Sequence, residues 1–376
     1  MEQIERTLAG KIAARLFKGK AIVLYGPRRA GKTTLCKKLL SRYKKGKYFL
    51  CDNPDVKDAL TNKTATELKD FIGNTNLVVL DEAQNIVNIG KSIKLLVDTY
   101  PKLQIIATGS SSFDLANSFV EPLTGRKYEF ELFPLSYKEI SMHEGGIEAK
   151  RKLERMMIYG LYPDIYLSPE SANQELIEEI KTSYLFKDIL AYQEIKNSDA
   201  LTRLLQMLAL QIGSEVSYSE LSRGIGIDIK TVQRYIDLLE KIFVIKKLPA
   251  LSRNRRTEIS KSRKIYFYDL GIRNALIRNF NPLGIRQDVG GLWENFCVME
   301  KIKNTSNKRQ FANFYFWRTW QQQEVDFIIE KGGSMEAFGF KWGGKKSASP
   351  AVFHDLYPNS TWKTVNRNNF ENFLET

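Results

Sequence analysis

The sequence predicts an α/β fold in its first third, a mainly helical middle and a small α/β domain at the end. From residue 21 to about 134, short apolar runs alternate with helical stretches, which is typical of a parallel sheet covered by helices. From 136 to about 210 the pattern becomes helical. Beyond residue 270, a helical stretch is followed by strands rich in aromatic residues. With 376 residues, the chain is long enough for two or three domains.

These changes of pattern divide the chain into four segments. We expect a parallel-sheet domain at 1–135, a helical segment at 136–213, a compact segment of two helices and a hairpin at 214–270, and a small α/β domain at 271–376. The expected strands of the first domain are AIVLY (21–25), YFLC (48–51), LVVL (77–80) and LQIIA (103–107).

Composition and charge narrow the class of protein. With 43% hydrophobic residues the chain can bury real cores, and it contains no apolar run long enough to cross a bilayer. The net charge of +14 favours polyanionic partners such as nucleic acid, although a lysine-rich solvated surface would carry the same charge. The first 20 residues predict an amphipathic helix and not a signal peptide, because they lack an apolar core.

Cysteine and histidine are scarce. Cys36, Cys51 and Cys297 are scattered and odd in number, which argues against a disulfide framework or a zinc site. His143 and His354 are the only histidines, so we expect no chemistry that needs several of them. A cytoplasmic protein is the expected result.

The strand at 21–25 runs directly into GPRRAGKTT, residues 26–34, and then into an apolar helix. This string matches the phosphate-binding pattern G-x-x-x-x-G-K-[ST] in the strand–loop–helix context that the pattern requires. The glycines let backbone N–H groups turn toward phosphate, and the helix N-terminus adds partial positive charge. Lys32 would reach the β- and γ-phosphates of ATP, and Thr33 would hold Mg²⁺. The predicted nucleotide contacts are Gly26, Pro27, Arg28, Arg29, Ala30, Gly31, Lys32, Thr33 and Thr34.

A second apolar strand supplies two adjacent carboxylates. The string LVVLDEAQ, residues 77–84, ends its strand in Asp81, which can hold Mg²⁺ through the water shell of the ion. Glu82 follows at once and is placed to orient and deprotonate the attacking water. Together with the phosphate loop, this pair predicts ATP hydrolysis and not only ATP binding.

Hydroxyl groups and an arginine complete the predicted nucleotide site. The strand LQIIATGSSS, residues 103–112, ends in hydroxyls, and Thr108 and Ser110 are candidates to sense the γ-phosphate. The alternative is a Gly/Ser turn that only closes a strand. Arg126 in LTGRK is a candidate arginine finger, which would place positive charge at the transition state. Arg28 and Arg29, inside the loop itself, compete for that role.

Residues 218–251 predict a helix, a turn, a second helix and a hairpin. Ser219 is the expected cap of the first helix, and RGIGID forms the turn. An apolar stripe on the second helix leaves three polar residues outward: Lys230, Gln233 and Arg234. A DNA reader would place this helix in the major groove. The loop that follows would suit backbone phosphates through Arg253, Arg255 and Arg256. The alternative is a segment for packing or protein contact.

The last strands carry acids and a lysine, in EVDFII (324–329) and AFGFKWG (337–343). An acidic strand followed by a strand that carries a lysine is how one class of metal-dependent nuclease is built, since carboxylates fix Mg²⁺ and lysine stabilises developing charge. Such a site needs an acid two residues before Lys341, and Gly339 stands there. Glu336 points to the opposite face, whereas Glu324 shares a face with Asp326 and could partly substitute.

Seven strings along the chain occur together: YGPRRAGKTTL, VVLDEAQ, ATGSSSFDL, LTGRKYEFELFPLSYKE, KIYFYDLGIRNAL, GLWENF and EVDFII. This combination resembles a large bacterial and archaeal family of AAA+-like ATPases. Members of that family join a P-loop domain to a winged helix and a C-terminal domain of the PD-(D/E)xK nuclease type. The resemblance runs to about residue 343 and implies the same roles for Lys32, Thr33, Asp81 and Glu82.

For the last domain, the resemblance implies a nuclease-like site made of Glu294 on a helix, Asp326 on a strand, and Lys341. With Gly339 in place of the usual glutamate, we expect a retained but disabled nuclease fold. A strand glycine packs little, so a restored glutamate is expected to find room there. Three tryptophans are expected in the core: Trp317, Trp320 and Trp342.

The resulting hypothesis is an ATPase that uses ATP and Mg²⁺ and couples its nucleotide state to DNA contact through the winged helix. Its nuclease-like domain is expected to be inactive. The alternative is a nucleotide-dependent switch that binds a protein partner and does not touch DNA. The expected partners are therefore ATP and either double-stranded DNA or another protein, with no membrane and with an oligomer allowed.

Overall fold

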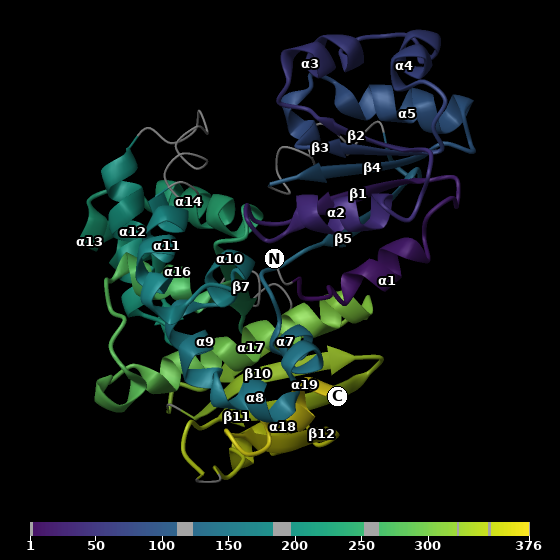
Figure 1. The fold of residues 1–376 in the computed structure, drawn as a ribbon. Coiled ribbons are helices and arrows are strands. Elements are labelled where there is room, and N and C mark those ends of the chain that lie inside the picture. Colours follow the sequence, from purple (N-terminus) through teal and green to yellow (C-terminus); the bar gives the residue numbers. More distant parts are fainter. Residues whose placement is uncertain are drawn as a thin grey trace. The chain divides into compact units, whose positions relative to one another are not determined.

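The computed structural model describes residues 3–110, 123–182, 197–251, 263–321, 323–344 and 347–375. They form two compact units (Figure 1). The first contains Met1–Leu135 with Lys241–Phe243, and the second contains Ser136–Glu240 with Val244–Thr376. The predicted fold class is confirmed, because an α/β unit with a five-stranded parallel sheet is followed by a helical region and a small mixed sheet.

The first unit is a parallel sheet with helices on both faces. Its strands pair in the order β2-β3-β4-β1-β5. They are β1 (Ala21–Tyr25), β2 (Gly46–Leu50), β3 (Leu77–Asp81), β4 (Gln104–Gly109) and β5 (Lys127–Glu131). The helices are α1 (Leu8–Ala13), α2 (Lys32–Leu40), α3 (Pro54–Leu60), α4 (Ala65–Ile72) and α5 (Ile89–Thr99). The N-terminal helix is thus confined to six residues of the 20 that the sequence suggested.

The strand order separates the ends of β1 and β3 at the carboxyl edge of this sheet. Every residue of β1, β3 and β4 is buried, as expected for strands covered on both faces. α1 and α2 pack on one face against Ile22, Leu24 and Ile106, and α3, α4 and α5 lie on the other face (Figure 1). Since β4 lies between β1 and β3, the ends of β1 and β3 are two strand spacings apart, about 10 Å.

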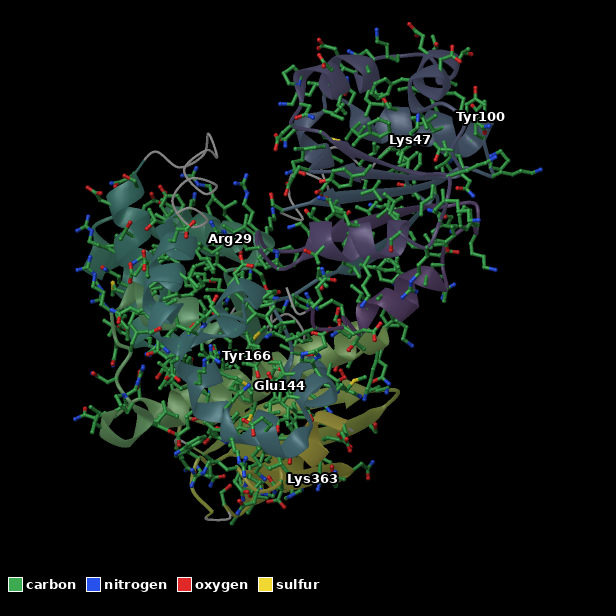
Figure 2. All side chains as sticks on the ribbon, viewed as in Figure 1. Arg29, Lys47, Tyr100, Glu144, Tyr166 and Lys363 are labelled. Carbon is green, nitrogen blue, oxygen red and sulfur yellow. The ribbon has the colours of Figure 1, made fainter. Side chains whose placement is uncertain are left out.

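The second unit begins with helices and ends with a mixed sheet. Its helices are α7 (Tyr137–Glu144), α8 (Gly146–Arg151), α9 (Leu153–Tyr159), α10 (Pro163–Tyr166), α11 (Asn173–Ile180), α12 (Ser198–Leu210), α13 (Tyr218–Ile225), α14 (Ile229–Lys241), α16 (Leu270–Leu276), α17 (Val289–Lys308), α18 (Ala351–Leu356) and α19 (Phe370–Glu375). Polar contacts join the first of them. The Tyr166 hydroxyl donates to Glu144 Oε2 at 3.0 Å, and Lys152 Nζ lies 2.7 Å from the same oxygen (Figure 2).

Two sheets lie in this unit. The smaller is antiparallel, in the order β6-β8-β7, and consists of β6 (Glu215–Val216), β7 (Ile245–Pro249) and β8 (Arg263–Phe267). The larger has the order β12-β11-β10-β9 and consists of β9 (Asn313–Arg318), β10 (Glu324–Lys331), β11 (Ser334–Phe340) and β12 (Ser360–Val365). Trp317 is buried in its core and Trp342 packs against Trp293, with ring centroids 5.3 Å apart. Trp320 is 98% exposed, so its expected place in the core is wrong.

The two helices α13 and α14 follow the predicted helix–turn–helix pattern. The first is capped by Ser217, whose Oγ accepts a hydrogen bond from the Glu220 N–H at 3.4 Å. The predicted cap, Ser219, lies inside the helix, because the helix begins two residues earlier than expected. Gly226, at a φ of 81°, ends α13 in the left-handed conformation that glycine adopts without steric cost. Asp228 then accepts from the Thr231 N–H at 2.8 Å and starts α14.

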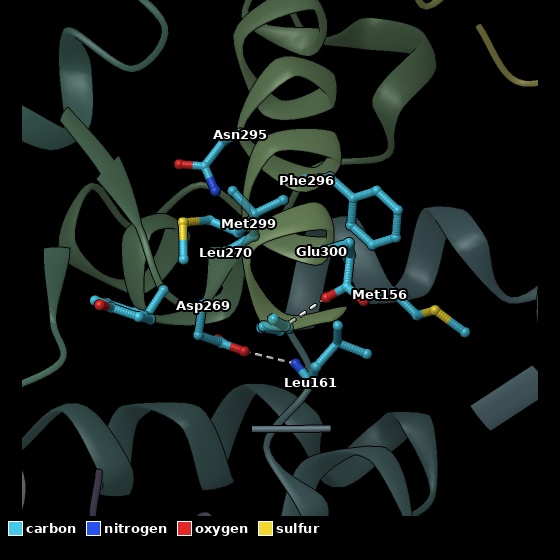
Figure 3. A pocket seen from close by; sticks show the side chains of 11 residues that line it. Met156, Leu161, Asp269, Leu270, Asn295, Phe296, Met299 and Glu300 are labelled. Atoms are coloured by element: carbon cyan, nitrogen blue, oxygen red, sulfur yellow. Dashed lines mark hydrogen bonds and ion pairs between the residues drawn. The ribbon is translucent and has the colours of Figure 1, made fainter. Parts of the chain in front are cut away.

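A small pocket in the second unit is lined by polar groups that already have partners (Figure 3). Asp269 accepts hydrogen bonds from the N–H groups of Leu161, at 2.6 Å, and Ile272, at 3.2 Å. Lys303 and Glu300 form an ion pair of 2.8 Å. Gly160 is required here, since a Cβ would lie 2.0 Å from an Asp269 oxygen. Asp269 therefore ties the start of α16 to the chain just after α9.

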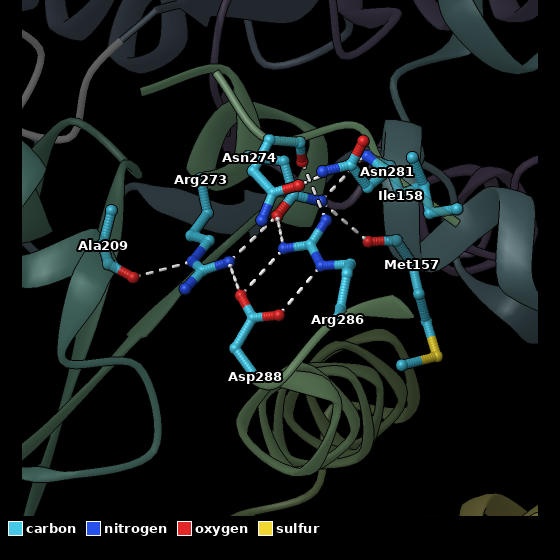
Figure 4. A network of polar contacts seen from close by, with 9 residues as sticks. Met157, Ile158, Ala209, Arg273, Asn274, Asn281, Arg286 and Asp288 are labelled. Atoms are coloured by element: carbon cyan, nitrogen blue, oxygen red, sulfur yellow. Dashed lines mark hydrogen bonds and ion pairs between the residues drawn. The ribbon is translucent and has the colours of Figure 1, made fainter. Parts of the chain in front are cut away.

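A second polar network holds the helical region together (Figure 4). Arg273 and Arg286, both with side chains 1% exposed, share the carboxylate of Asp288. Arg273 also donates to the Ala209 carbonyl at 2.7 Å, at the end of α12. Asn274 donates to the carbonyls of Met157 and Ile158 on α9, at 3.0 and 2.8 Å. The network thus connects α9, α12 and α16 to the start of α17. Among the helices described, none is long and apolar enough to span a bilayer.

Candidate functional site

The phosphate loop lies between β1 and α2, where the sequence predicts it. Gly26 has a φ of 153°, and a Cβ there would lie 2.0 Å from the Leu132 carbonyl oxygen, so only glycine fits. Gly31 has a φ of 95° and caps the N-terminus of α2. Arg28 and Arg29 are exposed on the loop, as is Thr34 at the start of the helix, whereas Ala30 is buried. This backbone directs the helix N-terminus toward the space beside the loop.

Lys32 is buried, 4% exposed, at the start of α2. Its ammonium donates to the carbonyls of Gly26 at 2.8 Å and Pro27 at 3.0 Å. Burial lowers the pKa of Lys32, against the raising effect of Glu82 and Asp81. The ammonium is therefore held inside its own loop, next to the two acids.

Asp81, at the end of β3, is the centre of a hydroxyl cluster. Thr33 Oγ1 and the Tyr48 hydroxyl each donate to Asp81 Oδ2 at 2.6 Å. Thr108 donates to the other carboxylate oxygen and also accepts from the Glu82 N–H, at 3.1 Å. Burial, followed by the bond to Asp81, raises the pKa of Tyr48, so its hydroxyl remains a donor. The loop threonine and the strand aspartate are thus side by side, in the arrangement that a Mg²⁺ site requires.

Glu82 sits in a left-handed backbone conformation, with φ 55° and ψ 46°. This region is uncommon for residues other than glycine, and such strain concentrates at functional sites. Gln84 donates through Nε2 to Glu82 Oε2 at 2.5 Å and to Ser110 Oγ at 3.3 Å. The predicted base is therefore held by an amide that also contacts one of the predicted sensors of the γ-phosphate.

Two residues that sequence analysis missed support this site. Tyr48 lies on β2, and only strand pairing brings it to Asp81. Arg6 donates to the Ala30 carbonyl in the phosphate loop and to the Phe133 carbonyl after β5, each at 2.6 Å. Neither residue belongs to a motif, so no local signal in the sequence reveals it.

Arg126 lies at the amino edge of the sheet, away from the phosphate loop. The Ala21 N–H donates to the Arg126 carbonyl at 2.9 Å, which puts Arg126 beside the first residue of β1. The phosphate loop follows the last residue of that strand, about 16 Å away. At the amino edge, Arg126 pairs with Asp98 at 2.6 Å. It therefore cannot act as an arginine finger for the phosphates of its own chain.

The predicted DNA-contacting side chains of α14 are on its surface. Lys230, Gln233 and Arg234 are exposed, while Val232, Tyr235 and Ile236 are buried. The other predicted contacts, Arg253, Arg255 and Arg256, lie outside the residues that the structure describes.

The predicted nuclease-like acids come together, but around a different lysine. Lys264 on β8, 1% exposed, lies 2.7 Å from Glu294 Oε1 and 2.5 Å from Glu324 Oε1. Lys341 is exposed and forms no ion pair with the residues described. The Phe340 N–H donates to Asp326 Oδ2 at 2.8 Å. Lys341 acts electrostatically on Asp326, and Asp326 acts on Glu294, so a nuclease-like set of these three residues stays a prediction.

Gly339 does not leave room for a glutamate. A Cβ at this position would lie 2.8 Å from Trp362 Cη2 and 3.0 Å from Ser347 Oγ. The expectation of open space is wrong, because the indole of Trp362 on the neighbouring strand β12 fills it.

Known protein families match three parts of this chain. Residues 18–141 match a family described as an AAA domain. Residues 150–283 and 289–367 match domains of unknown function, DUF8612 and DUF4143. An uncharacterized protein of Mycobacterium tuberculosis is 27% identical over 354 residues, 93% of this chain and 76% of that protein. One from Methanocaldococcus jannaschii is 26% identical over 341 residues, 85% and 74% of the two chains.

Among solved structures, the chain is similar to a Walker-type ATPase of Pyrococcus abyssi. The TM-score is 0.52 at 16% sequence identity, over 73% of this chain and 96% of that one. At this identity the likeness concerns the fold. Together with the AAA match, it supports an ATP-binding domain of AAA type in the first unit.

Proposed function

We propose that this chain binds ATP with Mg²⁺ and hydrolyses it, and that its nucleotide state governs how the second unit contacts DNA. The observation that carries hydrolysis is the meeting of Thr33 and Asp81, 2.6 Å apart, with Glu82 as the next residue along the chain. Thr33 lies at the start of α2, just after the phosphate loop, and Asp81 is the last residue of β3. In the sheet, β3 is two positions away from β1, the strand that precedes the loop.

Each residue of the site has a distinct task in this proposal. Lys32 leaves the carbonyls of Gly26 and Pro27 and binds the β- and γ-phosphates. Thr33 and Asp81 are the residues that would hold Mg²⁺, which neutralises charge on the phosphate oxygens when bound. Glu82 accepts a proton from the attacking water, and Gln84 fixes the direction of its carboxylate.

The DNA part of the proposal rests on the order of elements in the second unit. α12, β6, α13, α14, β7 and β8 follow one another as in a winged helix. α14 is the second helix of the pair, and it exposes Lys230, Gln233 and Arg234. The segment between β7 and β8 is strongly basic in sequence, and the whole chain carries +14. Basic side chains of this kind bind the phosphate backbone.

A protein partner is the second candidate, favoured by two exposed aromatic side chains. Phe311 is 94% exposed and Trp320 is 98% exposed. Aromatic residues are enriched in protein interfaces, where their burial contributes much of the binding energy. Under this alternative, the ATP cycle would regulate contact with another protein.

Lys32→Ala tests ATP binding. Without this ammonium the phosphates lose the long-reach cation of the loop, so tight binding should disappear in a calorimetric titration. Lys44→Ala, which removes an exposed lysine outside the loop, is the matched control and should bind ATP normally. Unchanged affinity in Lys32→Ala would remove the phosphate loop from the proposed function.

Glu82→Gln tests hydrolysis separately. This variant keeps the shape of the side chain but lacks the base, so ATP should remain bound while the hydrolysis rate falls by roughly 10²–10⁴. Phosphate release under single-turnover conditions is the measurement. Turnover near the wild-type rate would show that Glu82 is not the base.

A further inference from the structure

Lys264 lies in the centre of three acids in the second unit. Its ammonium is 2.7 Å from Glu294 on α17 and 2.5 Å from Glu324 on β10, and its side chain is 1% exposed. Asp326, two residues along β10 from Glu324, also acts electrostatically on the ammonium. The Tyr266 hydroxyl donates to the same Glu294 oxygen at 2.6 Å.

The charges in this cluster depend on one another. Burial alone would lower the pKa of Lys264, but Glu294, Asp326 and Glu324 raise it, so the ammonium keeps its charge. Burial raises the pKa of Glu294 to about 7, although Lys264 counteracts the shift. A buried ammonium is stable only when its partners stay close and ionised.

This arrangement does not fit a divalent metal ion. Mg²⁺ needs oxygen ligands at about 2.0–2.1 Å in nearly octahedral geometry. Here the space between the carboxylates of Glu294 and Glu324 is taken by a positively charged group within hydrogen-bond distance of both. The position of a further carboxylate, Gly339, is covered by the ring of Trp362. Within the described residues, no group of three acids, histidines or cysteines is arranged to hold a metal.

We propose that Lys264 is the resident cation of this site: its ammonium takes the place that a divalent metal ion would occupy among Glu294, Glu324 and Asp326. The wild-type chain therefore binds no metal there. The same contact ties β8, α17 and β10 together through charge. Removal of the ammonium leaves three carboxylates without their buried counter-charge, and an external cation can then take its place.

Lys264→Met is the variant that tests this proposal, since methionine is unbranched and neutral. Bound Mn²⁺ is counted by electron paramagnetic resonance without nucleotide at pH 8. We expect one more Mn²⁺ per chain than in the wild type. Adding Asp326→Asn should abolish the gain. Lys246→Met, which removes a half-buried lysine paired with Glu240 in the same small sheet, is the matched control and should add none.

Three results would overturn the proposal. The first is a Mn²⁺ ion in the wild type that is lost in Glu294→Gln, because metal and lysine would then share the site. The second is a folded Lys264→Met that gains no Mn²⁺. The third concerns a variant that fails to fold. In that case, Mn²⁺ or the second substitution Glu294→Gln should restore the fold by rebalancing charge, and failure of both would show that Lys264 does not act as a cation here.

Discussion

At the scale of single residues, the candidate site depends on hydroxyl groups that orient one carboxylate. Asp81 accepts from Thr33, Tyr48 and Thr108. The hydrogen-bond partners of a metal-binding carboxylate hold it in position and tune its affinity. Tyr48 lies 33 residues before Asp81 along the chain, and it comes from the edge strand of the sheet.

Tyr48→Phe should therefore weaken Mg²⁺ binding while leaving the fold intact. The change removes the 2.6 Å bond to Asp81 and keeps the ring. We expect the Mg²⁺ concentration for half-maximal ATP hydrolysis to rise by about 10-fold. Tyr43→Phe is the matched control, since its hydroxyl has no hydrogen bond to the residues described. An unchanged Mg²⁺ requirement in Tyr48→Phe would mean that this bond does not position Asp81.

Sequence analysis locates the residues of this site that share a motif and misses those that come from elsewhere. Lys32 and Thr33 follow from the loop pattern, and Asp81 from the end of an apolar strand. Tyr48 reaches Asp81 only because β2 pairs with β3, and a register is not written in either strand alone. The position of Arg126 cannot be read from the sequence for a related reason. Its distance from the loop depends on β5 running parallel to β1.

At the scale of elements, the helices of the second unit depend on one charged network. Asp288 precedes α17 and neutralises Arg273 and Arg286, whose side chains are 1% exposed. Burial alone would raise the pKa of Asp288, but the bonds to Arg286 and Arg273 lower it to about 2. None of this is visible in the sequence, because α9, α12 and α16 meet only in the folded chain.

Asp288→Asn should loosen α16 by about 3 kcal/mol at pH 7, since it leaves two buried guanidinium groups without a counter-charge. The free energy of opening of α16, from native-state hydrogen exchange, is the measurement. Glu148→Gln, in an exposed pair with Arg151, should change it by less than about 0.5 kcal/mol.

The lowered pKa of Asp288 also predicts how the difference in opening free energy between wild type and Asp288→Asn depends on pH. A carboxylate with a folded pKa of about 2 stabilises the fold above its ordinary pKa, and the effect is lost as the pH falls toward 2. The gap between wild type and Asp288→Asn should therefore shrink between about pH 4 and pH 2. A gap that stays constant over this range would mean that the ionised carboxylate is not its cause.

The positions of strands along the chain are predicted better than the packing between them. Apolar runs give β1, β3 and β4 because these strands are buried throughout, so composition alone marks them. Gly339 shows the limit. Its place in a strand is clear from the sequence, whereas the indole that fills the space beside it belongs to β12, more than 20 residues later.

At the scale of the whole molecule, the proposed ATP cycle would regulate a contact of the second unit with DNA or with a protein. The first unit supports ATP binding, and the second presents both basic side chains on α14 and exposed aromatic ones. DNA binding and protein binding respond differently to salt. Contacts with DNA phosphates release counterions, so the logarithm of affinity falls linearly with the logarithm of salt concentration.

Replacing Arg253, Arg255 and Arg256 together by alanine should therefore weaken binding to unrelated DNA duplexes equally. If each arginine contacts one phosphate, the salt slope should become less steep by about 2–3, because each lost contact accounts for about 0.9. Fluorescence anisotropy at several salt concentrations, with ATP present, is the measurement. Replacing the exposed Lys44, Lys91 and Lys102 of the first unit by alanine removes the same charge and is the matched control.

The triple lysine variant distinguishes direct contact between the arginines and DNA from a general electrostatic effect of the net charge. A basic segment that touches DNA changes the slope only in the arginine variant, whereas a diffuse effect of the +14 charge changes both variants alike. The rate of ATP hydrolysis, measured with and without duplex, completes the test, since coupling requires that DNA change it in the wild type and change it less in the arginine variant. Equal slopes and a rate indifferent to DNA would favour the switch that binds a protein, with Trp320 and Phe311 as the first residues to substitute.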